Sequence, residues 1–157
     1  MKIVVAAVGK VKAGHFEAGC QDYLSRLAHS FPTRVVEVKD APRTGGGTPE
    51  RWRALEAAGI LAALPPGGRL VALDERGTNP TSVAFAEYLG KLRDQSVPAV
   101  VFAIGGPDGL DETVRQRADR VISFGAMTMP HELVRLVLLE QLYRAGTILA
   151  GTPYHRV

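Results

Sequence analysis

The sequence has little of three things that would narrow its function at once: cysteine, long apolar runs and excess charge. Cys20 is the only cysteine among 157 residues, which excludes an intrachain disulfide or a cysteine metal cluster and favours the cytoplasm. The apolar stretch at residues 133–139 is far too short to span a bilayer, so we expect no membrane segment. Lysine and arginine exceed aspartate and glutamate by 19 to 16, a balance that permits a polyanionic partner without demanding one.

The sequence also lacks internal repeats, low-complexity segments and a linker between domains. We therefore predict a single domain over residues 1–157, a length that allows a substantial core. No spacing of histidine, aspartate or glutamate suggests a metal site, and we expect none.

Apolar, β-branched runs alternate with helical patterns along the chain. Strands are predicted at residues 2–8, 33–39, 69–74, 98–104 and 120–124, and helices at residues 15–30, 49–64, 83–92, 111–118 and 131–150. Thr48 is the expected N-cap of the second helix, and Thr81 or Ser82 that of the third. Because the strands are continuous apolar runs, they predict an α/β fold whose parallel sheet is covered on both faces.

Apolar residues surround nearly the whole of the last predicted helix: Leu133, Val134, Leu136, Val137, Leu138, Leu139 and Leu142. A surface helix needs only one apolar stripe. Either this helix is central within one subunit, or its second face is covered by another copy of the chain. The pattern favours a homodimer with a two-fold interface.

The stretch "VFAIGGPDGL", residues 101–110, ends a predicted strand in a glycine-rich turn. Ligands bind outside the carboxyl ends of strands in open α/β sheets. This loop has neither the lysine of a P-loop nor the spacing of a dinucleotide fingerprint, and Asp108 would repel a phosphate. A ligand site and a plain tight turn, with Pro107 second and Gly109 fourth, stay equally open.

Two further strand ends point to the same edge of the sheet. Leu73 and Asp74 close one strand, and "SFGAMTMPH", residues 123–131, links another to the last helix. The second segment carries no charge before His131. Its backbone groups and apolar side chains suit an adenine ring and a thioether better than phosphates.

Taken together, "FAIGGPDG", "MTMPHELVRLVLLEQLYRA" and "PYHR" resemble the SPOUT-class ribosomal RNA large subunit methyltransferase H family, over essentially the whole chain. The resemblance implies an S-adenosylmethionine-dependent enzyme that methylates N3 of a pseudouridine in 23S rRNA on the assembled ribosome. It also implies a homodimer, and an α/β sheet whose C-terminal part is threaded into a deep trefoil knot that builds the cofactor site.

Carried over by motif, the resemblance places the cofactor contacts at Leu73, Gly105, Gly106, Gly125, Ala126, Met127, Thr128, Met129 and Pro130. Gly125 stands where the family often has serine or alanine, and Met129 where leucine or phenylalanine is more usual. Both should preserve backbone contacts. The segment "RTGGGTPERW", residues 43–52, matches nothing specific in the family.

The tail "PYHRV" supplies the candidate catalytic residues Tyr154, His155 and Arg156. His155 can accept a proton near neutral pH, Arg156 can stabilise developing negative charge, and Tyr154 can stack on a base. Terminal residues often do nothing, so the resemblance carries this prediction. All three stay candidates.

Three further interpretations concern the rest of the site. We expect His131 to be structural and Arg135, one turn on, to face the active cleft. Candidate contacts to RNA phosphates are Lys10, Lys12, Arg43, Arg51 and Arg53. Two other functions stay open: a SPOUT enzyme with another target, such as a tRNA ribose 2′-hydroxyl, and a non-catalytic ribosome-binding factor.

Overall fold

In the computed structural model, strands and helices alternate as predicted. Over residues 1–43 and 45–156, which the structure describes, the order is β1 (Lys2–Val8), α1 (Gly14–Leu27), β2 (Thr33–Val38), α2 (Pro49–Ala62), β3 (Arg69–Thr78), α3 (Ser82–Asp94), β4 (Ala99–Ile104), α4 (Glu112–Arg117), β5 (Arg120–Ile122) and α5 (His131–Ala150).

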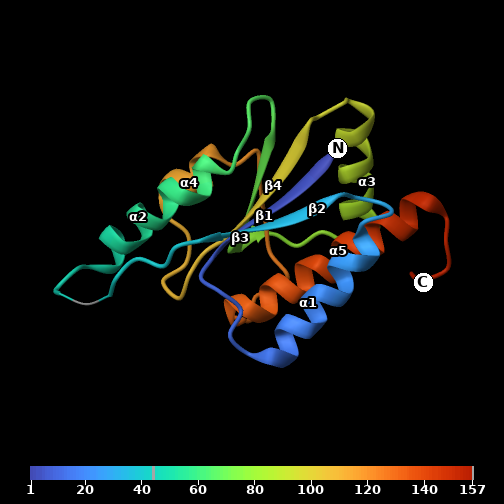
Figure 1. Ribbon diagram of the computed structural model, residues 1–157. Coiled ribbons are helices and arrows are strands. Elements are labelled where there is room, and N and C mark those ends of the chain that lie inside the picture. Colours follow the sequence, from blue (N-terminus) through green and yellow to red (C-terminus); the bar gives the residue numbers. More distant parts are fainter. Residues whose placement is uncertain (44, 157) are drawn as a thin grey trace.

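The strands form one parallel sheet in the order β2-β1-β4-β3-β5 (Figure 1). The central strands β1 and β4 are buried along nearly their whole length, which explains their continuous apolar runs. Leu73 of β3 pairs with Ile104, the last residue of β4, so the pairing of these two strands ends there. The predicted α/β class is confirmed, and the junction of β3 and β4 becomes the place to look for a site.

The helices cover the sheet on both faces (Figure 1). Helices α1, α3 and α5 pack on one face against Ile3, Val5 and Ala7 of β1. Helices α2 and α4 pack on the other face against the alternate residues of β1, which are Val4, Ala6 and Val8. The sheet is therefore the middle of three layers.

Helix α5 lies between α1 and α3, over the sheet. A Cβ added at Gly19 of α1 would lie 2.9 Å from Leu136, and one at Gly90 of α3 would lie 2.9 Å from Leu149. Three leucines of α5 are fully buried: Leu138, Leu139 and Leu142. Most of its apolar circumference is thus buried within one subunit, and the homodimer stays a prediction. No helix in residues 1–43 and 45–156 has the length and apolarity needed to cross a membrane.

Side chains cap two of the helices where the sequence predicts it. The Thr48 hydroxyl accepts a hydrogen bond from the Arg51 N–H at 3.4 Å, at the start of α2. Thr81, not Ser82, caps α3, because its hydroxyl accepts from the Ala84 N–H at 3.1 Å. Both helices therefore begin at positions fixed by local sequence.

Strand β3 is longer than predicted and changes register after Leu73. Its end, Thr78, pairs with Ile122 of β5, and the Ser123 N–H donates to the Thr78 carbonyl at 2.7 Å. A Cβ on Gly77 would lie 2.6 Å from the backbone of Ile122, so only glycine allows this approach. Residues 77–78 and 122–123 are thus in direct backbone contact, while the threading of a trefoil knot stays a prediction.

Candidate functional site

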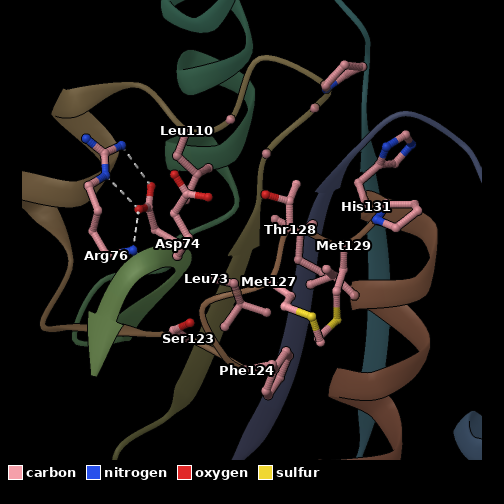
Figure 2. A pocket seen from close by; sticks show the side chains of 18 of the residues that line it. Leu73, Asp74, Arg76, Leu110, Ser123, Phe124, Met127, Thr128, Met129 and His131 are labelled. Carbon is pink, nitrogen blue, oxygen red and sulfur yellow. Dashed lines mark hydrogen bonds and ion pairs between the residues drawn. The ribbon is translucent and has the colours of Figure 1, made fainter. Parts of the chain in front are cut away.

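A cavity of about 670 Å³ opens at the carboxyl ends of β3 and β4 (Figure 2). Three segments line it, residues 73–76, 104–110 and 122–131, and α5 adds Val134. The volume falls within the range of small-molecule sites, about 300–1,000 Å³. The three strand ends that the sequence singled out therefore meet around one hollow.

Nearly all of the predicted cofactor residues line this cavity. Ala126 is exposed and is not part of the lining. The lining includes Leu73, Gly105, Gly106, Gly125, Met127, Thr128, Met129 and Pro130.

The glycine-rich loop after β4 contains the predicted tight turn, since the Gly109 N–H donates to the Gly106 carbonyl at 3.0 Å. A Cβ on Gly105 would lie 2.6 Å from the carbonyl carbon of Gly109. One on Gly106 would lie 3.0 Å from Val8 and 3.2 Å from Glu56. Gly105 is thus required by the packing of the chain itself, whereas Gly106 is closely packed against side chains.

The link from β5 to α5 forms the opposite wall. The Ser123 hydroxyl donates to the Gly125 carbonyl at 2.7 Å, and the Gly125 N–H lies 3.1 Å from the same hydroxyl oxygen. Gly125 has a φ of +138°, a conformation that favours glycine. Met127 is 82% exposed, so its thioether is open to a ligand or a partner. Figure 2 shows the side chains of this wall around the cavity.

Carboxylates in the cavity wall are held by arginines. Asp74 lies 2.9 Å from Arg76 and 3.2 Å from Arg115, and its side chain is only 6% exposed (Figure 2). Burial opposes the charge of Asp74, but the hydrogen bonds and charge of Arg76, together with the charge of Arg115, outweigh it and lower the pKa of Asp74. Asp108 is paired with Arg43 at 2.9 Å. Both carboxylates are thus neutralised by guanidinium groups, and the repulsion of a phosphate by Asp108 stays a prediction.

The tail lies on another part of the molecule. The Tyr154 hydroxyl donates to Glu140 at 3.1 Å and lies 3.3 Å from the Tyr23 hydroxyl, while Arg144 lies 3.4 Å from His155 Nδ1. Residues 154–156 are not part of the cavity lining. Glu140 is six residues beyond Val134, the last cavity residue on α5, a rise of about 9 Å. In Figure 1 the tail lies beside the C-terminal part of that helix, away from the end where α5 begins. One subunit therefore does not bring the candidate catalytic residues to its own cavity.

His131 lines the cavity, but Arg135 does not face it, and that expectation was wrong. Arg135 is 2% exposed, its Nη2 donates to the Gly9 carbonyl at 2.8 Å, and its Nη1 lies 3.6 Å from Glu37. It turns away because the chain leaving β1 offers an acceptor under the helix.

Two of the five candidate phosphate contacts are engaged within the chain. Arg43 is bound to Asp108 and Glu56. Arg53 lies 3.3 Å from Glu50, and its Nη1 donates to the Asp108 carbonyl at 3.4 Å. The other three are exposed: Lys10, Lys12 and Arg51.

Sequence reasoning missed the contributions of Arg115 and Glu56, because their partners become neighbours only in the folded chain. Arg115, for instance, reaches Asp74 across 41 positions. Sequence reasoning also missed Arg76, although its partner Asp74 is only two residues away and this spacing is visible in the sequence. In the described part of the chain, histidine, cysteine, aspartate and glutamate side chains form no group of three that could hold a metal ion.

The comparisons with known proteins define the class. The family model described as "Predicted SPOUT methyltransferase" matches residues 1–155, and the chain belongs to this family. Three relatives are each named "Ribosomal RNA large subunit methyltransferase H". Those from Rhodospirillum centenum, Methylocella silvestris and Nitrobacter hamburgensis are 49%, 46% and 45% identical, over 99% of this chain and 99% of each relative. The family and class of enzyme predicted from the motifs are confirmed.

Proposed function

We propose that the chain is an S-adenosylmethionine-dependent methyltransferase that modifies N3 of a pseudouridine in 23S rRNA on the assembled ribosome, in the cytoplasm. The observation that carries the proposal is the cavity, because three separate segments named by the motif resemblance converge on it. Relatives of nearly equal length that are named for ribosomal RNA support the substrate class.

The chemistry of the cavity fits the proposed methyl donor. Leu73, Ile104 and Val134 provide apolar surface, and the segments 105–106 and 123–130 provide backbone donors and acceptors. Such a mixture suits an adenine ring with a thioether-like chain. When bound, S-adenosylmethionine supplies an electrophilic methyl group on a positively charged sulfur.

Methylation at N3 requires that the proton on this nitrogen be removed, so the chain has to supply a base or stabilise the anion. Arg156 is exposed, and its guanidinium can neutralise charge on a base carbonyl. His155 has a buried Nε2 with no hydrogen-bond partner in the described chain. Because Arg144 can only donate, its contact with Nδ1 assigns the ring proton to Nε2. His155 therefore accepts a proton only after this contact opens.

Tyr154 serves as the anchor of the tail. Burial, the hydrogen bond with Tyr23 and the nearby carboxylate of Glu140 raise the pKa of Tyr154 well above its ordinary value. Its hydroxyl is therefore neutral at physiological pH and a poor proton acceptor. The Arg144 guanidinium lies 4.7 Å from the Tyr154 ring centre, which adds a cation–π contact. Proton transfer and charge stabilisation are left to His155 and Arg156.

We further propose that the active site is completed between two copies of the chain, in a two-fold homodimer. The support is the position of the tail, about 9 Å or more along α5 from the cavity of its own subunit. The outward side of α5 also carries Leu133 and Val137, which are only half-buried. We expect a second copy to cover these residues and its tail to reach the first copy's cavity.

Mixed dimers test this arrangement. One variant, Gly105→Val, places a side chain where the glycine-rich turn of the cavity wall has room only for backbone. A second variant, His155→Ala with Arg156→Ala, removes the candidate catalytic side chains of the tail. Each variant alone should be inactive and dimeric by light scattering. An equal mixture after subunit exchange should recover about one quarter of wild-type activity, because about half of the dimers are mixed and each has one complete site. Inactive mixed dimers would contradict completion across subunits.

The enzymatic proposal has its own test. Ribosomes lacking the modification are incubated with the protein and isotope-labelled S-adenosylmethionine, and the methylated nucleotide is mapped by mass spectrometry. Methylation of a tRNA ribose would assign another substrate. Ribosome binding without measurable binding of S-adenosylmethionine by calorimetry would show a non-catalytic factor.

A further inference from the structure

Arg43 and Glu56 lie directly behind the glycine-rich wall of the cavity. Glu56 of α2 is 2% exposed, and its Oε1 accepts hydrogen bonds from the Ala41 N–H at 3.0 Å and from Arg43 Nη2 at 3.2 Å. A buried carboxylate thus holds both the backbone and the arginine of the preceding loop. This loop and the first turn of α2 contain the sequence "RTGGGTPERW", for which the family resemblance gave no role.

Arg43 connects this segment to the cavity. Its Nε and Nη2 donate to Asp108 Oδ2 at 3.0 and 2.9 Å. Its guanidinium lies 5.6 Å from the centre of the Trp52 ring, which restrains it further. One arginine therefore bridges Glu56 on one side and Asp108, in the cavity wall, on the other.

Glu56 also contacts the turn itself. Its Oε2 would lie 3.2 Å from a Cβ on Gly106, and Arg43 Nη2 would lie 3.4 Å from the same atom. The backbone at Gly106 therefore rests against this buried ion pair. Glu56 Oε2 is buried and has no hydrogen-bond partner among the described residues, a costly arrangement whose benefit to stability is small.

We propose that Arg43 is a positioning residue that, with Glu56, clamps residues 105–109 in the conformation that binds the methyl donor. The inference rests on the proposed function, since it assumes that this cofactor occupies the cavity. A loop with three glycines has much conformational freedom in the free protein. Fixing it before binding removes an entropy cost that would otherwise weaken affinity. Arg43 does this without touching the ligand, because it acts through Asp108 and the turn.

Calorimetry with S-adenosylmethionine, together with steady-state kinetics, tests the clamp. For Arg43→Gln we expect the Kd and the KM for the cofactor to rise about 3- to 30-fold, the range typical of coupling through a network. The kcat at saturating cofactor and the KM for ribosomes should change less than about twofold. Arg43→Lys should be intermediate, because an ammonium cannot hold two carboxylates as a guanidinium does. The matched control is Arg69→Gln, which breaks an exposed pair with Asp119 of equal length, 2.9 Å, and should change neither constant.

A double-mutant cycle separates the clamp from a direct role of Asp108 in binding. If Arg43 acts through Asp108, the double variant Arg43→Gln/Asp108→Asn should bind the cofactor no worse than the weaker-binding single variant, within about twofold. If the increases in Kd of the two single variants multiply in the double variant, the proposal is overturned. Amide hydrogen exchange at residues 105–109 should also accelerate in Arg43→Lys. This variant keeps the positive charge and replaces Arg43→Gln in the test if Arg43→Gln does not fold.

The outcomes also separate this inference from the proposed function. Wild-type protein that does not bind S-adenosylmethionine refutes the proposed function. Wild-type protein that binds it, with an Arg43→Gln variant that binds equally well, refutes the clamp alone.

Discussion

Replacing Gly105 by alanine adds one methyl group where the fold has no room for it. The new Cβ would lie 2.6 Å from the Gly109 carbonyl carbon, 2.7 Å from its oxygen and 2.9 Å from the Leu110 nitrogen. Ordinary contact begins near 3.4 Å, so the facing backbone has to retreat by about 0.8 Å, and overpacking of this kind costs about 1–3 kcal/mol of stability. A shift approaching 1 Å in groups that position a reactant costs on the order of 10- to 100-fold in rate. We therefore expect kcat/KM for the methyl donor to fall at least about tenfold.

Urea unfolding and cofactor-dependent methylation measure the two effects. Gly14→Ala is the matched control, because a Cβ there meets nothing within 4 Å and the residue lies in α1. It should be neutral or stabilising by about 0.5–1 kcal/mol, with unchanged kinetics. A Gly105→Ala protein with the stability and kcat/KM of the wild type would refute the reasoning.

Three more predictions concern polar groups. Asp74→Asn should lower the free energy of unfolding by about 2 kcal/mol at pH 7. Because the pKa of Asp74 is lower in the folded state, the stabilisation by its carboxylate is present above about pH 4 and should vanish as the pH falls further. The stabilities of the wild type and the variant should therefore converge in acid unfolding. Arg135→Met should cost about 1–3 kcal/mol in urea, since the Gly9 carbonyl loses its donor. Thr81→Ala should cost about 1 kcal/mol by removing the α3 cap, with calorimetric melting as the measurement.

The sequence predicts the strands, the helices and the edge of the sheet where the cavity opens, because these depend on local periodicity and on a general rule for parallel sheets. The contacts that shape the cavity are different. Arg43 binds Asp108, which is 65 positions away in the sequence, and nothing in the sequence around Arg43 indicates that partner. The close approach of Gly77 to Ile122 likewise follows from the pairing of β3 with β5 and not from local spacing.

The last helix shows the limit of periodicity most clearly. Apolar residues all round α5 indicate burial on several sides, but the pattern does not say whether the covering elements belong to the same chain. The neighbours α1 and α3 supply most of that cover. The position of the tail, which no pattern predicts, is now the stronger reason to expect a second copy.

The central place of α5 also affects how the protein folds. Residues 1–130 alone would lack the helix that fills the space between α1 and α3, and the core on that face of the sheet would lose Leu138, Leu139 and Leu142. The two N–H groups of Lys12 and Ala13 reach Glu132 across about 120 positions, and β1 pairs with β4 nearly 100 residues away. Contacts between residues so far apart in the sequence form late and slowly, so a partly synthesised chain exposes hydrophobic surface that favours aggregation. Chaperone contact during synthesis is the expected protection for a chain whose core is completed last.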